Sequence, residues 1–409
     1  MIKTEAKKNI LLAVTGSIAA YKSAELARLF ISKGFNVRCA MTSSAEKFIS
    51  ALTLETITGS PVMTDLWQSN KSSYEIEHIE LADWADVVSV APASADIIAK
   101  MTYGFADSAL SAVLLATRAP VLIAPAMNVN MYEHPKTREN IEELKKRGVV
   151  FIEPESGDLA CGWIGKGRLA NAGEVFHRVM KALCLQDLEQ KRVVVSTGPT
   201  REAIDPVRFV SNRSSGKMGI ALATDAYYRG AEVTLVHGPL SLDVLSTIPS
   251  EVRKISVTSA EEMKNAMLDL SYNDKLSQPH IVIMAAAVSD YRPAQPAAEK
   301  IKKSGDREII ELTMNDDILS LLGQKKSGAE PYLVGFAVET GDVEELLKEV
   351  DKKLKIKNVD LMVGNLAEDA FGLDSNRVWL VDRYGRRDEI PGTSKSRVAS
   401  KVLDAVLRG

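Results

Sequence analysis

One cysteine of the chain stands in a glycine-rich segment, where its thiol could donate a proton to a substrate. Cys161 lies within residues 157–169, and four of the eleven residues from 157 to 167 are glycine. Such a segment is typical of a mobile flap, and a thiol there is well placed for general acid chemistry. Cys39 and Cys184 suit buried small hydrophobic side chains. The three cysteines have no paired spacing, which argues against a disulfide framework or a zinc site.

Three short stretches of the first half place small hydroxyl side chains after apolar strands. They are Gly16-Ser17-Ile18, Thr42-Ser43-Ser44 and Pro92-Ala93-Ser94, and they follow predicted strands at residues 9–14, 37–41 and 86–91. Because the carboxyl ends of parallel strands meet at one edge of a sheet, the stretches predict one crevice for a phosphorylated, flat ligand. Capping of three helices is the alternative interpretation. The pattern GxGxxG is absent, so nicotinamide binding of the usual kind is not expected.

Two more polar residues of the first half could contact a ligand. His78 has the acidic neighbours Glu77 and Glu80. A lone histidine is nevertheless more often structural or exposed than catalytic. Asn128 follows a predicted strand at residues 121–124, where it could be a turn residue or could bind a ligand carboxylate.

Residues 197–219 of the second half are dense in small donors, prolines and cations. The cations are Arg201, Arg208, Arg213 and Lys217, which suit phosphate groups. The run at residues 214–216 precedes a predicted helix, whose N-terminus could bind an anion. The pattern GxxxxGK[ST] is not matched, so a P-loop is not expected.

Three lysines further along could also reach phosphates. Lys300 lies within residues 287–312, which read as a long loop or arm, and long loops of this kind are usually functional or mobile. Lys353 and Lys357 lie four residues apart and so share one helical face. The alternative for this pair is solvated charge that favours the C-terminal end of the helix dipole.

The elements that must position these residues alternate between strands and helices in both halves. This alternation predicts α/β domains with parallel sheets, of flavodoxin-like or Rossmann-like type. The pattern pauses near residues 183–191 and then starts again with a strand, so we expect domains at 1–188 and 189–409. The predicted strands of the second half lie at 192–196, 232–236, 280–286, 332–337, 359–363 and 377–381, with helices at 217–229, 260–270, 343–355 and from 394.

The composition describes a globular protein. A chain of 409 residues is longer than one ordinary domain, so we expect at least two hydrophobic cores. The 45% hydrophobic and 26% charged residues exclude wholesale disorder. The 51 Lys+Arg and 54 Asp+Glu leave a net charge of −3, which gives no support for nucleic-acid binding. Apolar runs such as 281–288 fall far short of the ~18 residues of a membrane helix. The N-terminus reads as a first strand and not as a signal peptide. We therefore expect a cytoplasmic protein.

The motifs of the first half resemble those of flavin-dependent cysteine decarboxylases. They are Gly16-Ser17-Ile18-Ala19-Ala20-Tyr21-Lys22, His78, Pro125-Ala126-Met127-Asn128-Val129-Asn130-Met131 and Leu159-Ala160-Cys161-Gly162. More narrowly, the stretch to about residue 185 is similar to the phosphopantothenoylcysteine decarboxylase half of bifunctional enzymes of coenzyme A biosynthesis. Asp96, Tyr132 and Asn171-Ala172-Gly173 stand where that family usually has Asn, Trp and Ala-Glu-Pro.

This resemblance implies FMN chemistry. FMN would oxidise the substrate thiol, carbon dioxide would leave, and the reduced flavin would return a hydride while Cys161 supplies the proton. His78 would act as a base or hydrogen-bonding partner near the flavin, and Asn128 would bind the substrate carboxylate. The residues implied to bind FMN are Gly16, Ser17, Ile18, Thr42, Ser43, Ser94 and Met127.

The motifs of the second half resemble those of phosphopantothenate–cysteine ligase. They lie at residues 197–209, 211–219, 286–292, 299–303, 335–340 and 374–376. Asp316 stands where the family usually has Pro, and Val338 stands for Ala. The resemblance implies that CTP activates 4′-phosphopantothenate as an acyl-cytidylate with release of pyrophosphate, and that the amine of L-cysteine then displaces CMP. Lysines and Mg²⁺ would stabilise the charge on the phosphoryl oxygens.

The ligase resemblance also implies roles for particular residues. Asn212 would stabilise the acyl-cytidylate, and Lys300 would contact the triphosphate. The residues implied to bind CTP are Ala286, Asp290, Lys300, Asn315, Asp317, Ile318, Phe336, Lys353 and Lys357. The ligands of Mg²⁺ are not identified.

The resemblance further implies a homo-oligomer, a dodecamer of decarboxylase trimers and ligase dimers with flavin sites between subunits. Two other functions compete with this hypothesis. A pair of nicotinamide-dependent oxidoreductase domains is disfavoured by the missing GxGxxG pattern. A flavin-binding regulatory protein of the same fold without turnover is disfavoured by Cys161 and by the complete second half.

Overall fold

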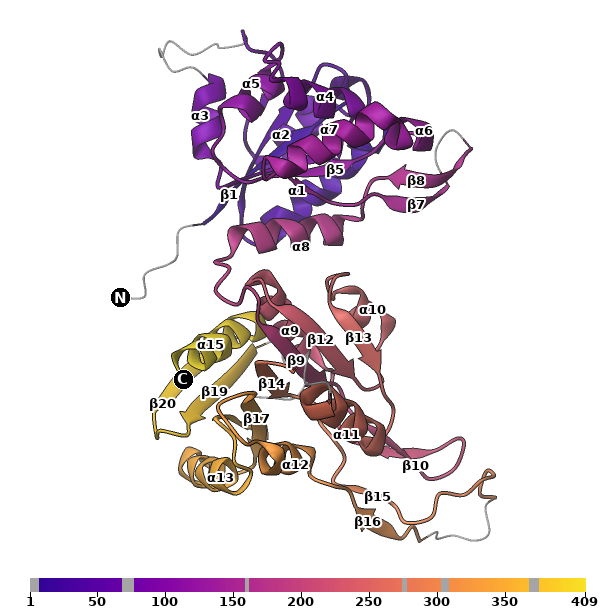
Figure 1. Cartoon of the computed structure of the whole chain (residues 1–409), viewed down its shortest axis with the longest axis vertical. Coiled ribbons are helices and arrows are strands. Elements are labelled where there is room, and N and C mark those ends of the chain that lie inside the picture. Colours follow the sequence, from indigo (N-terminus) through magenta and orange to yellow (C-terminus); the bar gives the residue numbers. More distant parts are fainter. Residues whose placement is uncertain (1–6, 68–76, 159–161, 274–277, 303–308, 368–374) are drawn as a thin grey trace. The chain divides into compact units, whose positions relative to one another are not determined.

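A computed structural model describes residues 7–67, 77–158, 162–273, 278–302, 309–367 and 375–409. The chain forms two compact units, Met1–Cys184 and Leu185–Gly409, and each has its own sheet and hydrophobic core (Figure 1). Both units are of α/β type, which confirms the expected fold class. Cys161 and the residues beside it, 159–160, lie outside the described residues.

The first unit is built around a parallel sheet of six strands in the order β3-β2-β1-β4-β5-β6. Its elements are β1 (Asn9–Val14), η1 (Ile18–Lys22), α1 (Ser23–Ser32), β2 (Asn36–Met41), η2 (Ala45–Lys47), α2 (Ala51–Thr58), β3 (Val62–Met63), α3 (Glu77–Trp84), β4 (Val87–Ala93), α4 (Ala95–Tyr103), α5 (Ala109–Ala116), β5 (Val121–Pro125), α6 (Val129–Glu133), α7 (Pro135–Lys146), β6 (Val150–Phe151), β7 (Glu155–Asp158), β8 (Ile164–Arg168) and α8 (Ala172–Leu183). The strand order reverses between β1 and β4, and ligands of such sheets bind beyond the carboxyl ends at that point.

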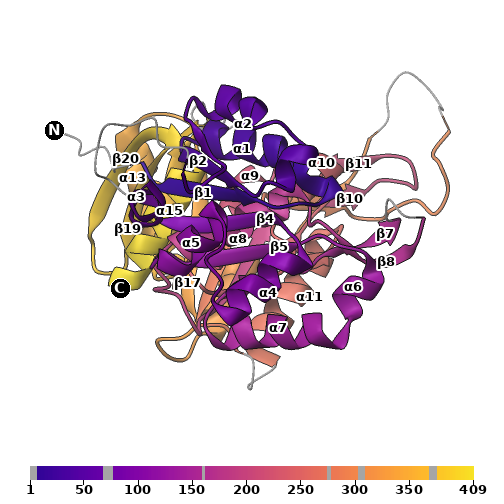
Figure 2. The ribbon, with the colours of Figure 1, turned by 90° about the horizontal axis from the view of Figure 1, so that it is seen from above.

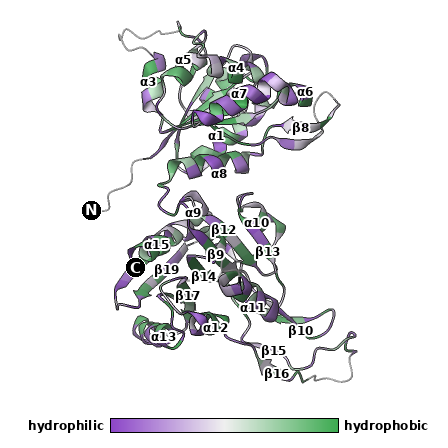
Figure 3. Cartoon of the chain, in the orientation of Figure 1, coloured by the Kyte–Doolittle hydropathy of each residue, from purple (hydrophilic) through white to green (hydrophobic). Residues whose placement is uncertain are grey.

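Helices cover both faces of this sheet. Helices α1, α2 and α8 bury side chains against one face, and α3, α4, α5 and α7 bury side chains against the other. Every residue of β4 is buried, as expected of a parallel strand that is covered on both sides. In α8, Val175 and Val179 are buried one turn apart, and hydrophobic and hydrophilic residues alternate around the helix (Figure 3). The carboxyl edge of the sheet is thereby held on a rigid base.

The second unit contains an eight-stranded sheet in the order β13-β12-β9-β14-β17-β18-β19-β20. Its elements are β9 (Arg192–Thr197), β10 (Arg201–Ala203), β11 (Phe209–Ser211), α9 (Lys217–Tyr228), β12 (Glu232–His237), α10 (Leu242–Ser246), β13 (Arg253–Ser256), α11 (Ala260–Leu268), η3 (Asp269–Asn273), β14 (Ile281–Met284), β15 (Tyr291–Pro293), β16 (Leu312–Met314), α12 (Ile318–Lys325), β17 (Tyr332–Glu339), α13 (Val343–Ile356), β18 (Leu361–Leu366), β19 (Ser375–Asp382), β20 (Arg387–Ser394) and α15 (Lys395–Arg408). The strands β13, β12, β9, β14, β17 and β18 run parallel, and β19 and β20 are antiparallel additions.

Two parts of the second unit differ from the sequence-based expectation. Residues 287–312 were expected to be a loop throughout, but Tyr291–Pro293 forms β15, which pairs with Leu312–Met314 as an antiparallel ribbon. The edge strand Arg387–Ser394 was not expected at all. Most of its side chains are exposed, so it lacks the apolar run by which a strand is recognised in a sequence.

The connector between the units packs with the second unit from residue 185 onward. Leu188 is fully buried in the core beneath α9, and Asp187 forms a two-pronged ion pair with Arg229 at 2.7 and 2.5 Å. The units therefore divide after Cys184, four residues before the boundary that the sequence pattern indicates.

Candidate active sites

A buried threonine joins the carboxyl ends of β1 and β4, where the strand order reverses. The hydroxyl of Thr15 donates to the carbonyl oxygen of Pro92 at 2.8 Å and accepts from the backbone N–H of Ser94 at 2.8 Å. Thr15 is 1% exposed. It therefore fixes the start of α4 against the end of β1, although nothing in its sequence context distinguishes it from an ordinary strand residue.

The turn after β1 lies tightly against the turn after β2. A Cβ atom on Gly16 would lie 2.5 Å from the Cβ of Ser44, so a side chain at Gly16 would push the two turns apart. Ser17 accepts from the N–H of Ala19 at 3.3 Å, and Thr42 accepts from the N–H of Ala45 at 3.3 Å. The predicted hydroxyl stretches do meet at one edge of the sheet.

The hydroxyls of these stretches act as local caps. Ser94 accepts from the N–H of Ile97 and caps the start of α4. Ser17 caps the start of η1 in the same way, by accepting from the N–H of Ala19. The capping interpretation is therefore correct for these two side chains. The neighbouring Ser43 and Ile18 are exposed at the same edge.

The hairpin β7–β8, which leads to and from the segment with Cys161, is anchored at the carboxyl end of β5. The N–H of Met127 donates to the carbonyl oxygen of Gly167 at 3.0 Å, and a Cβ atom on Gly167 would lie 2.3 Å from the oxygen of Met127. Gly165 packs in the same way on Val129. These two glycines thus allow β8 to pack closely on the segment that follows β5, whereas the sequence pattern had indicated only flexibility.

Asn128 and His78 lie on different sides of the first unit. Asn128 begins α6, where its Oδ1 accepts from the N–H of Asn130 at 2.9 Å. His78 is half-buried in the first turn of α3. Figures 1 and 2 both show α3 and α6 at opposite ends of the first unit, although both helices pack on the same face of its sheet. One copy of the first unit does not bring these two predicted site residues together.

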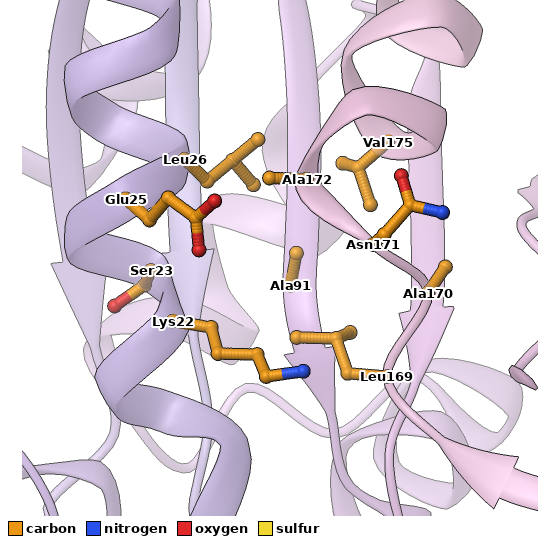
Figure 4. A pocket seen from close by; sticks show the side chains of 10 residues that line it. All are labelled: Lys22, Ser23, Glu25, Leu26, Ala91, Leu169, Ala170, Asn171, Ala172 and Val175. Atoms are coloured by element: carbon orange, nitrogen blue, oxygen red, sulfur yellow. The ribbon is translucent and has the colours of Figure 1, made fainter. Parts of the chain in front are cut away.

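A small cavity opens beside the reversal of strand order, between α1, β4 and the start of α8 (Figure 4). Lys22 and Glu25 point into it from the α1 side, and Ala91 forms part of its apolar wall. Its volume is about 90 Å³. Ligand pockets span roughly 300–1,000 Å³, so this cavity cannot enclose a flavin ring system.

Residues that depart from the resembled decarboxylase pattern make contacts of their own. Tyr132 is buried, and its hydroxyl donates to Glu153 at 3.2 Å. Lys166 of β8 donates to the same carboxylate at 2.6 Å. Burial, followed by the charge of Glu153, raises the pKa of Tyr132 to about 12. Asp96 forms an ion pair with Lys100 at 3.4 Å.

In the second unit, three side chains fix the loop that follows β14. Asn212 donates from Nδ2 to the carbonyl oxygen of Val288 at 2.9 Å, and Asn315 donates to that of Ser289 at 2.8 Å. The hydroxyl of Thr200 accepts from the N–H of Ser289 at 3.0 Å. The loop that carries Ala286 and Asp290 is therefore rigidly placed beside Asn212 and Asn315. Thr200, which is fully buried, was missed by sequence analysis.

The start of α9 packs directly on the end of β9. The hydroxyl of Thr197 donates to the carbonyl oxygen of Gly216 at 2.7 Å, and a Cβ atom on Gly219 would lie 2.4 Å from the Cβ of Thr197. Gly216 has a φ of +71°, which only glycine adopts readily. The run at residues 214–216, which is predicted to bind an anion, thus directly precedes a helix of twelve residues.

Lys353 and Lys357 bind different carboxylates of the protein. Lys353 pairs with Glu339 of β17 at 2.5 Å, and Lys357 pairs with Asp317 at 2.8 Å. Burial by itself would raise the pKa of Asp317, but the hydrogen bonds from Lys357 and from Ser320 outweigh it and lower that pKa. Both ammonium groups are therefore engaged by carboxylates of the protein and are not simply solvated.

The remaining residues predicted to bind CTP belong to several elements of the second unit. Asp317 caps α12 by accepting from the N–H of Ser320 at 3.0 Å, while the side chain of Ile318 is buried in the core. Phe336 of β17 is half-buried against the core on the α9 side. Lys300 is exposed. Asp316, which replaces the usual Pro, pairs with Lys264 of α11 at 2.9 Å.

The described residues contain no group of three or more His, Cys, Asp or Glu side chains suited to hold a metal ion. Across the same described parts of the chain, no helix is both long and apolar enough to cross a membrane.

Comparison with known proteins assigns both halves to families. Residues 2–184 match the family described as Flavoprotein, and residues 188–408 match the DNA/pantothenate metabolism flavoprotein C-terminal domain. The coenzyme A biosynthesis bifunctional protein CoaBC of Bacillus subtilis is 43% identical over 405 residues, which cover 98% of this chain and 96% of that protein. The chain belongs to the CoaBC family. It is a bifunctional enzyme of coenzyme A biosynthesis, with a flavoprotein domain followed by a C-terminal domain of the second family.

A second relative and one solved structure are also similar to this chain. The CoaBC protein of Haemophilus influenzae is 42% identical over 403 residues, which are 98% of this chain and 97% of that protein. A crystal structure of the C-terminal domain of a CoaBC protein is 38% identical, covers 53% of this chain and 94% of that domain, and has a TM-score of 0.43. The resemblance stated from the motifs is confirmed, and the family favours an enzyme over a regulatory protein without turnover.

Proposed function

We propose that the two units catalyse consecutive steps. The second unit joins L-cysteine to 4′-phosphopantothenate at the expense of CTP, through an acyl-cytidylate. The first unit then decarboxylates phosphopantothenoylcysteine to 4′-phosphopantetheine with FMN. The observation that carries this proposal is the match of both family models in one chain, together with relatives named as bifunctional over nearly their full length.

The turns at the reversal of strand order fit the phosphate of FMN. Gly16 allows the turns after β1 and β2 to approach closely, and Thr15 places the N-terminus of the nine-residue α4 at the same edge. Helix N-termini favour phosphate groups. We assign the FMN contacts to Gly16, Ser17, Ile18, Thr42, Ser43, Ser94 and Met127. When bound, FMN would supply the two-electron redox chemistry that makes loss of carbon dioxide accessible.

The protein residues would then orient the substrate and move a proton. Asn128 lies at the carboxyl end of β5 and would bind the substrate carboxylate through its amide. The hairpin anchored on Met127 would bring the thiol of Cys161 to the substrate, and Cys161 would donate the proton to the product carbon. His78 would act as a base or hydrogen-bonding partner near the flavin.

We propose that the flavin site is completed by a second copy of the chain. His78 and Asn128 lie at opposite sides of one unit, and the cavity beside α1 is too small for a flavin ring. Exposed apolar side chains, Ile18 at 59%, Tyr21 at 61% and Leu52 at 67%, lie in or near the turns at the carboxyl edge. A homo-oligomer, proposed as a dodecamer of decarboxylase trimers and ligase dimers, would bring the two residues into one site. The three cysteines have no paired spacing that would indicate a disulfide framework, so we propose a cytoplasmic location.

In the ligase step, Asn212 would stabilise the acyl-cytidylate and Lys300 would neutralise charge on the triphosphate of CTP. We assign CTP binding to residues around the loop that Asn212 and Asn315 fix: Ala286, Asp290, Lys300, Asn315, Asp317, Ile318, Phe336, Lys353 and Lys357. Mg²⁺ commonly binds through one or two carboxylates together with substrate phosphates, so it would bind with CTP.

The test is a pyrophosphate assay without cysteine. The proposal requires that pyrophosphate release depends on both CTP and 4′-phosphopantothenate, and that the purified protein shows a flavin absorption spectrum. Release with ATP alone, or a colourless protein that does not take up FMN, would contradict it.

A further inference from the structure

The turn between β10 and β11 holds the arm on which Lys300 lies. The N–H of Ala297 donates to the carbonyl oxygen of Ile204 at 2.9 Å. The N–H of Ile301 donates to Oδ2 of Asp205 at 3.2 Å, and Nη2 of Arg208 donates to the carbonyl oxygen of Ile301 at 3.2 Å. The backbone N–H and carbonyl groups of Ile301, the residue after Lys300, are therefore bound by the side chains of Asp205 and Arg208.

Asp205 is the centre of this arrangement. Its side chain is fully buried, and its Oδ1 accepts from the N–H groups of Val207 and Arg208 at 2.8 Å each. Its Oδ2 accepts from Nε and Nη2 of Arg208 at 3.0 and 2.6 Å. The hydrogen bonds from Arg208 hold the pKa of Asp205 well below its usual range. The carboxylate is therefore ionised at neutral pH, the charge state in which it accepts these hydrogen bonds.

We propose that Asp205 is a positioning residue for Lys300 in the ligase step. The inference rests on the proposed function, in which the ammonium group of Lys300 meets the triphosphate. Lys300 is exposed, so its side chain is directed mainly by the backbone that carries it. Asp205 and Arg208 bind that backbone at its next residue and so restrict where the ammonium group can reach. Restricting a catalytic group in this way contributes to rate, because less motion must be frozen in the transition state.

The arrangement also changes the role expected of Arg208. The sequence pattern counted Arg208 among the cations available for phosphate. In the structure its guanidinium group is engaged by the carboxylate of Asp205 and by the carbonyl oxygen of Ile301. Its fork geometry suits this combination of acceptors, which the single ammonium group of a lysine could not reproduce.

The experiment compares Asp205→Asn with the wild-type chain, and with Asp388→Asn as a control for the loss of a carboxylate that pairs with an arginine. Asp388 pairs with Arg408 at 2.6 Å in the same unit, and both are half-exposed and distant in sequence from the arm. Asp205→Asn should speed hydrogen exchange of the peptide that contains residues 297–302 by at least about tenfold, because it weakens charge-assisted hydrogen bonds. It should slow cytidylate formation in a single turnover at saturating CTP by at least about tenfold. Asp388→Asn should change neither.

A double variant separates positioning from general destabilisation. If Asp205 acts through Lys300, then Asp205→Asn should have no further effect on cytidylate formation in a Lys300→Gln chain. Equal slowing in both backgrounds would overturn the inference, as would faster exchange of the arm with normal cytidylate formation. A wild-type chain that forms no cytidylate from CTP would instead refute the proposed ligase activity, and with it this role. Should Asp205→Asn not fold, Arg208→Lys removes the forked donor while it keeps the charge, and the same comparison applies.

Discussion

Replacing Thr15 by Val should loosen the carboxyl edge of the first unit. The change keeps the shape of the side chain but removes the donor to Pro92 and the acceptor for Ser94, both at 2.8 Å. The carbonyl oxygen of Pro92 keeps its bond from the N–H of Thr15 at 3.2 Å, whereas the N–H of Ser94 loses the partner described for it. Leaving such a donor unpaired costs about 1–3 kcal/mol.

For a unit of this size, a loss of about 2 kcal/mol lowers the melting temperature by about 4–8 °C. The assay is thermal unfolding of the full chain. It is monitored through the release of bound flavin, so that only unfolding of the first unit is observed. FMN affinity should fall as well, because the start of α4 is no longer held against β1. Thr15→Ser should retain most of the wild-type melting temperature and FMN affinity, since it keeps the hydroxyl.

Thr56 provides the matched control for this experiment. Its hydroxyl donates only to the carbonyl oxygen of Leu52 within α2, at 2.7 Å, and the residue is exposed. Thr56→Val should therefore change the melting temperature little. If Thr15→Val releases flavin at the wild-type temperature and binds FMN equally well, the bridge between β1 and β4 does not organise the site.

Three further predictions concern the two proposed reactions and the second core. Cys161→Ser should still bind FMN, but its reaction should stop after carbon dioxide is lost, because a hydroxyl is a much weaker acid than a thiol. Normal formation of 4′-phosphopantetheine would show that Cys161 is not the proton donor. Asn212→Asp should still release pyrophosphate but should transfer little acyl group to cysteine, whereas Lys300→Gln should hardly form the cytidylate. Rapid-quench assays with labelled CTP distinguish the two variants. The reversed behaviour would exchange the proposed roles of the two residues. Burial raises the pKa of Asp225 from 3.8 to about 6, so folding favours its protonated form and stability falls as the pH rises from about 4 to about 6. Asp225→Asn should therefore raise the melting temperature at pH 8 more than at pH 4, and an equal effect at both would show that burial does not govern this carboxyl group.

The sequence predicts the parallel strands well and the contacts between their ends poorly. Strands such as Asn9–Val14 and Val87–Ala93 are buried on both faces, so they appear as apolar runs. Thr15 and Thr200 each bridge two segments more than 70 residues apart, and only the folded chain brings their partners near. A single hydroxyl after a strand carries no pattern that distinguishes a bridge from a cap.

The same limit applies to charged residues. Lys353 and Lys357 share one helical face, as their spacing indicates, but the carboxylates that bind them come from other elements. His78 and Asn128 both belong to the resembled motif, yet the fold places them at opposite sides of one unit. Spacing along a helix is a local property, whereas the identity of a partner depends on how distant elements pack.

The way the connector is tied to the second unit decides where the chain can be cut to obtain each half alone. A second unit that begins at residue 189 would lose Asp187 and Leu188, so Arg229 would lack its two-pronged partner and the core beneath α9 would open to water. A cut after Cys184 leaves both with the half they stabilise. A second unit that begins at residue 185 should consequently be more soluble and more resistant to protease than one that begins at residue 189.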